Sequence, residues 1–354
     1  MVHLPYTRGH VASRSMETAA MANAVPATPS ANPLPSQRGE RGRRFLDEYR
    51  VELAMLGALA LLCIILTLIA PNFLTAGNLR NVLWQVTAMG IIAIGQTFVI
   101  LTGGIDLSVG GIAALSAMAG GLLMTANGDE RVTLGIIATL LIGLLAGTIN
   151  GLIIAYGRLA PFIVTLGMLS ITNSLTYVIS DAKSITGLPD AYRIWGRGEI
   201  MGVPLYLMTF IMLFILGQIF LSRTKPGRFI YAIGSNEEAA RLAGVNVRAY
   251  KTLPYAITGV LCAIAAIILS GKLGAIDPDT GTGLELRTIA AVVIGGTSLF
   301  GGKGSLYGTL IGVFLIGFLN NGLNLLRVNA FWQGTAVGVV IILSVLVERM
   351  SRRG

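Results

Sequence analysis

The stretch GQTFVILTGGIDLSVGGIAALSA, residues 95–117, consists of two apolar runs joined by a glycine-rich segment that contains one aspartate. An apolar run of about 20 residues is long enough to cross the hydrocarbon core of a membrane as a helix. The joining segment GGIDLSVGG, residues 103–111, is rich in glycine, which accepts the strained backbone angles of a tight connection. The stretch therefore predicts two membrane-spanning helices joined by a short hairpin.

The composition of the whole chain extends this prediction. The 354 residues are 54% hydrophobic and 12% charged, against about 25% charged in a soluble domain, and the mean hydropathy is +0.74. Because backbone in contact with lipid must satisfy its own hydrogen bonds, we predict an all-α polytopic membrane protein. In a membrane protein, Lys and Arg gather in the cytoplasmic segments. The net charge of +9 is therefore attributed to that side of the protein and not to a surface that binds nucleic acid.

Ten apolar segments are candidates for membrane spans, and the eighth, which is short and glycine-rich, has the least certain limits. Placing the N-terminus inside puts most of the 26 Lys and Arg residues in cytoplasmic segments, as membrane proteins prefer. Both termini are therefore predicted to be cytoplasmic. The segments are 51–70, 82–101, 105–126, 132–156, 160–179, 204–221, 252–271, 287–300, 305–326 and 332–348.

Residues 1–44 differ from the remainder of the chain. They are rich in Pro, Ala, Ser and Arg and contain no apolar run, so we predict a disordered cytoplasmic tail followed by one transmembrane domain over 45–350. Both histidines, His3 and His10, lie in this tail, which leaves the membrane part without a histidine for catalysis or metal binding. Cys63 and Cys262 lie inside apolar runs and are interpreted as core residues.

The longest predicted cytoplasmic loop, 222–251, contains the polar stretch AIGSNEEAARLAG at 232–244. Ser235 or Asn236 is suited to cap a helix, and Glu237 and Glu238 would then lie at the positive end of its dipole. Three alanines and Leu242 extend the helix, and Gly244 can end it in the left-handed conformation. Such a segment is either a solvated connector or a helix that docks on a soluble partner, and the loop's length favours docking.

The segments 103–111 and 295–302 resemble each other with an offset of 192 residues, since Gly103 aligns with Gly295 and Gly104 with Gly296. This indicates an internal repeat, a common feature of transporters. Asp106 is the only acid deep within an apolar stretch, where a charge is costly. Three roles are open for Asp106. It caps the next helix or shapes a gate together with Ser108, it contacts the substrate, or it takes part in proton coupling.

Other polar residues of the predicted spans suit an uncharged, hydroxyl-rich solute as a set. Individually, each either hydrogen-bonds such a solute or holds helices together. The candidates for the translocation pathway or its gate are Gln96, Gly103, Gly104, Asp106, Ser108, Gly110, Asn150, Asn173, Gly295, Gly296, Gly301, Gly302, Asn320 and Asn321.

The pattern Glu238-Ala239-Ala240-x3-Gly244 resembles the cytoplasmic loop of ABC importer permeases, in which a short coupling helix docks on the ATP-binding subunit. Three stretches, 95–117, 225–244 and 289–312, are similar to the ribose-type branch of sugar permeases, and the resemblance covers roughly residues 45–350. It implies that the coupling residues are Ser235, Asn236, Glu237, Glu238, Ala239, Ala240, Arg241 and Gly244.

The resemblance also implies a function and its partners. It predicts a permease at the plasma (inner) membrane of a bacterium, surrounded by lipid and paired with a second permease, with ATPase subunits inside and a sugar-binding protein outside. ATP and Mg²⁺ would bind the ATPase, since GTSLFGGKGS, residues 296–305, departs from a phosphate-binding loop at Thr297 and Gly304. The chain itself would then bind no cofactor and catalyse no reaction. The alternative is a stand-alone transporter of a small polar solute that is coupled to an ion gradient.

Overall fold

The computed structural model describes residues 50–125 and 131–329, together with isolated positions between 332 and 346. The chain divides into two units, Met1–Tyr49 and Arg50–Gly354. The predicted tail at 1–44 and more than half of the predicted span at 332–348 therefore lie outside the described residues. All the helices and strands of the described residues belong to the second unit.

Seven described helices are long and apolar enough to cross a membrane, which confirms an all-α polytopic membrane protein. Two further predicted spans are shorter helices, α4 (Val109–Thr125, 17 residues) and α12 (Leu284–Ile294, 11 residues). The set of ten full-length spans is thus not confirmed. The seven are α2 (Arg50–Ile69), α3 (Ala76–Leu101), α5 (Val132–Gly157), α6 (Pro161–Ser180), α8 (Leu205–Arg223), α11 (Val247–Leu273) and α13 (Leu306–Leu325).

The end of α12 departs from the predicted limit of residue 300. Gly295 and Gly296 stop the helix, and Gly296 has a φ of 79°. With a rise of about 1.5 Å per residue, an 11-residue helix reaches only about half-way across a bilayer. The predicted span at 287–300 is therefore a short helix followed by an irregular segment, residues 295–305.

Short elements connect the long helices. Between α8 and α11 lie α9 (Lys225–Ser235) and α10 (Glu237–Leu242), and between α6 and α8 lies α7 (Asp190–Arg197). Two small antiparallel ribbons are also present among the described residues. They pair β1 (Ile185–Thr186) with β4 (Ala275–Ile276), and β2 (Glu199–Ile200) with β3 (Val203–Pro204).

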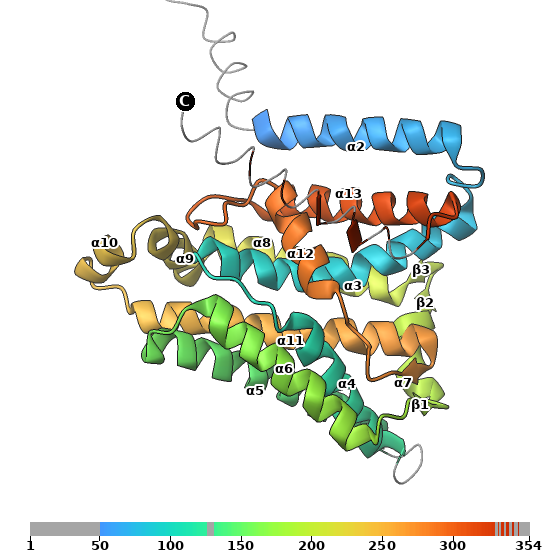
Figure 1. The fold of residues 1–354 in the computed structure, drawn as a ribbon, viewed down its shortest axis with the longest axis horizontal. Helices are drawn as coiled ribbons and strands as arrows, with labels where there is room; N and C mark the ends of the chain where they lie inside the picture. Colours follow the sequence, from blue (N-terminus) through green and yellow to red (C-terminus); the bar gives the residue numbers. More distant parts are fainter. Residues whose placement is uncertain are drawn as a thin grey trace, which may run out of the picture. The chain divides into compact units, whose positions relative to one another are not determined.

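The long helices differ in how deeply they are buried. The most apolar part of α3 is 83% buried, and those of α11 and α13 are 61% buried, whereas that of α2 is 11% buried. The outer helices expose large apolar side chains such as Leu68, Ile163 and Val178, as expected of surfaces that face lipid. In Figure 1, α2 runs beside α13, and α3 lies among α8, α11, α12 and α13.

The α5 and α11 helices approach each other closely because small residues line their contact. Gly143, Gly147 and Gly151 recur on α5 at four-residue spacing, and a Cβ on Gly147 would overlap the carbonyl oxygen of Tyr255 on α11. A Cβ on Gly151 would lie 2.7 Å from the carbonyl oxygen of Thr252. Stripes of small residues allow such close backbone packing between membrane helices.

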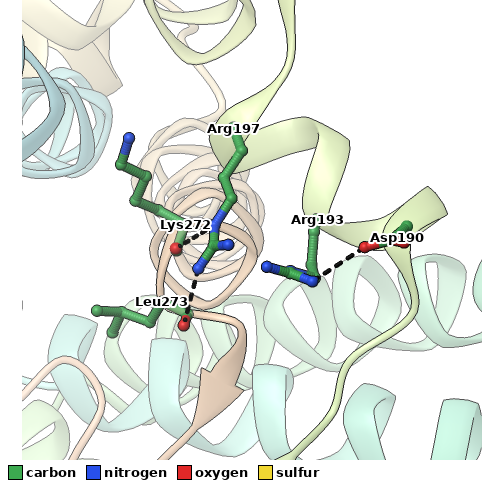
Figure 2. A network of polar contacts seen from close by, with 5 residues as sticks. All are labelled: Asp190, Arg193, Arg197, Lys272 and Leu273. Atoms are coloured by element: carbon green, nitrogen blue, oxygen red, sulfur yellow. Dashed lines mark hydrogen bonds and ion pairs between the residues drawn. The ribbon is translucent and has the colours of Figure 1, made fainter.

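The amphipathic helix α7 holds the end of α11 through its basic side chains (Figure 2). The Arg197 guanidinium donates to the carbonyl oxygens of Lys272, at 2.7 Å, and Leu273, at 3.2 Å, which have no partner further along the helix. Arg193 instead bonds Asp190 of its own helix at 2.9 Å. Burial raises the pKa of Tyr192 on the same helix to about 12, so its phenol stays neutral.

We expect the substitution Gly147→Val to destabilise the protein by roughly 1–3 kcal/mol, because the added side chain forces α5 away from α11. The matched control is Gly167→Val on the exposed side of α6, where a Cβ has no heavy atom within 4 Å. Thermal unfolding in detergent should show a lower midpoint for Gly147→Val alone. Equal midpoints for the two variants would contradict the close helix contact.

Candidate functional site

The polar stretch at 232–244 forms the end of one helix and a second short helix, with Asn236 between them. Asn236 caps α10, since its Oδ1 accepts a hydrogen bond from the backbone N–H of Ala239 at 3.0 Å. Ser235, the other candidate for this cap, is the last residue of α9. Gly244 follows α10 with a φ of 82°, as the predicted left-handed helix end requires.

One face of α10 is buried and the other is exposed. Ala240 packs in a small apolar cluster with Ile233 and Val247 and is 5% exposed. Leu242 lies on the opposite side and is 79% exposed. Sequence reasoning took Leu242 only as a residue that extends the helix, although a leucine among short polar residues was a visible signal.

The charged residues of α10 are paired locally. Glu237 bonds Lys251 at 2.7 Å, and Glu238 bonds Arg241 one turn along the helix. The hydrogen bond that Arg241 donates to the Glu238 carboxylate is the main cause of the raised pKa of the Arg241 guanidinium. Because both acids already have basic partners, Leu242 is the most conspicuous unpartnered group on the exposed face.

Both predicted glycine hairpins meet the end of α9. The N–H of Gly302 donates to the carbonyl oxygen of Leu101 at 2.9 Å. A Cβ on Gly234 would overlap that same oxygen and lie 2.5 Å from the Gly302 nitrogen, and a Cβ on Gly301 would lie 2.8 Å from the Gly103 nitrogen. We call these five residues the glycine junction, because backbone meets backbone there without side chains between.

The two hairpins begin with the same backbone turn. The N–H of Gly103 bonds the carbonyl of Ile100, and that of Gly296 bonds the carbonyl of Val293. Both glycines have positive φ, 77° and 79°. In the structure, the turn at Gly103 thus corresponds to the turn at Gly296. The sequence alignment instead pairs Gly103 with Gly295, one residue earlier. The internal repeat stays a prediction.

Four of the predicted pathway residues form one buried network. The Gln96 amide on α3 donates to the carbonyl oxygen of Asp106 at 3.2 Å. The Asp106 Oδ1 accepts from the Ser108 backbone N–H at 2.9 Å and from its hydroxyl at 2.5 Å. The Asn150 amide on α5 donates to the Ser108 hydroxyl oxygen at 2.8 Å. All four side chains are 0% exposed.

Several oxygen atoms of this network have no hydrogen-bond partner among the described residues. They are Oε1 of Gln96, Oδ2 of Asp106 and Oδ1 of Asn150, and the hydroxyl of Tyr255 on α11 is in the same condition. Tyr255, which sequence reasoning missed, occupies the space that a side chain on Gly104 would fill. Buried polar atoms are normally paired, so these groups can bond a polar solute or take partners in another conformation.

The other pathway candidates lie apart from this network. Asn321 on α13 exchanges two hydrogen bonds with Asn78 on α3, at 3.0 and 2.8 Å, which favours the helix-packing alternative for that residue. Its neighbour Asn320 is 7% exposed, and its Oδ1 has no hydrogen-bond partner within the described ranges. Asn173 on α6 lies beside Gly111, the last residue of the 103–111 segment.

The two remaining glycine candidates pack against backbone from other segments. A Cβ on Gly110 would lie 2.5 Å from the carbonyl oxygen of Gly281, and one on Gly295 would lie 2.7 Å from that of Gly308. Close packing accounts for glycine at both positions, whatever further role they have.

Comparison with known proteins places these features in a family. Residues 78–345 match the family model described as "Branched-chain amino acid transport system / permease component". The ribose import permease protein RbsC of Bacillus subtilis (strain 168) is 45% identical over 313 residues, which cover 88% of this chain and 96% of that protein. No solved structure matches the chain.

Two further relatives agree with this assignment. RbsC of Escherichia coli (strain K12) is 42% identical over 313 residues, 87% of this chain and 97% of that protein. The D-allose transport system permease protein AlsC of the same strain is 36% identical over 293 residues, 82% of this chain and 90% of that protein. The chain therefore belongs to the family of ABC importer permeases, in the ribose-type branch that the sequence resembled.

Proposed function

We propose that the chain is the membrane-spanning subunit of an ABC importer that carries a monosaccharide of the ribose class into the cell. The observation that carries the proposal is the 45% identity to a ribose import permease over 96% of that protein's length. Seven apolar helices and the bacterial relatives agree with a multi-pass protein of the plasma membrane.

The substrate is inferred to be a sugar although the family description names branched-chain amino acids. An amino acid carries a carboxylate, which a buried Lys or Arg would normally bind. Among the described residues, the buried set contains no Lys or Arg, and apart from Asp106 its polar side chains are those of Thr, Ser, Asn, Gln and Tyr. Amides, hydroxyls and one carboxylate are suited to hydrogen-bond the hydroxyl groups of a sugar.

The proposed partners bind at the two faces of the membrane. A cytoplasmic ATPase, which binds ATP and Mg²⁺, docks on the exposed side of α10, and a sugar-binding protein delivers its load at the outer face. A second permease, identical or closely related, completes the pathway. The excess of Lys and Arg in the segments predicted to be cytoplasmic supports this orientation.

The glycine junction offers a route from the ATPase to the pathway. Because α9 contacts both hairpins through backbone, a displacement of α10 and α9 would shift Leu101 and Gly302 without being absorbed by side-chain rotation. Asp106 lies a few residues after Leu101, so the buried network would move with it. Transport by alternating access needs such a link, and the chain itself makes and breaks no covalent bond.

A specific feature supports an ion-coupled transporter as the second candidate. Asp106 is 0% exposed, and its Oδ2 has no partner among the described residues, as expected of a residue that binds a cation or a proton during transport. No other Asp or Glu and no Lys or Arg belongs to the fully buried set of the described part, so Asp106 has no second fully buried charged group as a partner in a proton relay.

Uptake in proteoliposomes separates these candidates. We expect the chain, reconstituted with its ATPase, to accumulate sugar only when ATP and a loaded binding protein are both present. The Asp106→Asn variant keeps an acceptor for both Ser108 donors, so it should retain the same ATP requirement, with altered rate. Uptake driven by an imposed Na⁺ or H⁺ gradient, and lost in Asp106→Asn, would instead support the ion-coupled transporter.

We expect Leu242→Asp to weaken ATPase binding by roughly 30-fold, because a central apolar side chain at an interface commonly contributes about 2 kcal/mol. Sugar-stimulated ATP hydrolysis should fall with it. The control is Ala243→Asp, which adds the same charge to the exposed side of α10 but removes no large apolar group. Unchanged ATPase affinity in Leu242→Asp would show that α10 docks elsewhere.

We expect Gly234→Ala to reduce ATP-driven uptake roughly tenfold while leaving ATPase binding intact, because the added methyl group pushes α9 away from Leu101. Affinity for the ATPase and uptake rate are measured on the same preparation. Gly57→Ala on α2, where a Cβ has no heavy atom within 4 Å, is the control. Full uptake by Gly234→Ala would rule out the junction as the link.

A further inference from the structure

A cavity of about 640 Å³ has α10 as one of its walls. Its walls come from the end of α5, the connection to α6, α10 itself and the first turn of α11. Figure 1 shows these ends of α5, α6 and α11 gathered next to α10. Four cationic side chains line the cavity, Arg158, Arg241, Arg248 and Lys251, against the single carboxylate of Glu237.

Two of these four cations have no carboxylate partner. Lys251 is paired with Glu237 at 2.7 Å, and Arg241 with Glu238. Arg158 and Arg248 form no ion pair with any described residue. The guanidinium carbon of Arg248 lies over the face of Tyr156, 5.4 Å from the ring centroid. Two guanidinium groups with unused donors at one cavity match the charge and the geometry of a phosphate.

The apolar part of the cavity indicates that the phosphate belongs to a lipid. Leu159 and Pro161 form part of the wall, and the surface continues from there over Phe162 and Ile163 on the first turn of α6. Leu159, Phe162 and Ile163 are 51%, 55% and 65% exposed. A soluble anion would gain nothing from this surface, whereas an acyl chain attached to a headgroup in the cavity would cover it.

We propose that this cavity binds the headgroup phosphate of an anionic phospholipid of the cytoplasmic leaflet, with Arg158 and Arg248 as the binding residues. Basic pockets between helices on the cytoplasmic side are suited to such headgroups. The leaflet rests on the orientation given by the proposed function. Because α10 forms one wall, the bound lipid also holds the coupling helix against α5 and α11.

The test measures lipid retention on the purified full chain, without ATPase or sugar, so that it is independent of the transport proposal. The protein is exchanged into micelles that contain phosphatidylglycerol and phosphatidylcholine with identical acyl chains, and bound lipid is counted by native mass spectrometry. Phosphatidylglycerol should be retained in preference. The double variant Arg158→Asn, Arg248→Gln should weaken that retention on the order of 20-fold.

The variants are matched for folding and for charge. Arg158 has a φ of 53°, and Asn tolerates this left-handed conformation better than most residues. The control Arg223→Gln, Arg228→Gln removes two exposed cations of α8 and α9 that do not line the cavity. It should retain phosphatidylglycerol as the parent protein does, and both variants should elute as a single monodisperse species.

Three results would overturn the proposal. The first is equal retention of the two lipids by the parent protein, and the second is retention of phosphatidylglycerol that does not differ between the two double variants, whether both lose it or neither does. The third is stabilisation by millimolar inorganic phosphate equal to that by phosphatidylglycerol, since a soluble anion would then be sufficient. If only the cavity variant loses ATPase affinity while neither loses lipid, the cavity belongs to the ATPase interface instead.

Discussion

The hairpins and the buried network depend on one constraint, a direct contact of backbone with backbone. This contact lies at Leu101, Gly234 and Gly302, where no side chain comes between. A side chain at Gly234 would occupy the position of the Leu101 carbonyl oxygen, and the hydrogen bond between Gly302 and Leu101 spans 201 residues of sequence. Side chains absorb small displacements by changing rotamer, whereas directly packed backbone transmits them. Glycine is therefore needed here for contact as much as for conformation.

The same contact determines where the buried carboxylate lies. Leu101 ends α3, and the chain turns at Gly103, runs past Tyr255 at Gly104 and places Asp106 between Gln96 and Ser108. Burying a carboxylate away from water costs several kcal/mol unless donors surround it. Ser108 supplies two such donors to one oxygen of Asp106, and the other oxygen stays open. The hairpin thus holds a strongly polar atom at a fixed position inside an apolar bundle.

The sequence predicted features that depend on local pattern. Apolar runs located the long helices, and Asn236, Gly244 and the two glycine segments marked turns that the structure contains. The limit of α12 was wrong because a pair of glycines ended the helix earlier than hydropathy indicated. The gathering of Gln96, Asp106, Ser108 and Asn150, and the presence of Tyr255 beside them, depend on how α3, α5 and α11 pack. No single-sequence pattern contains that information.

The charges of α10 change how its docking should be understood. The two adjacent glutamates make α10 acidic in sequence, yet Lys251 and Arg241 already neutralise them. Exposed ion pairs contribute little to stability and are weakened by salt. What remains on the outer side is Leu242, with the small side chains of Ala239 and Ala243 around it. A protruding leucine among small side chains is suited to enter a hydrophobic pocket. In the proposed docking, the acids therefore orient and anchor the helix, and the leucine provides the contact for the partner.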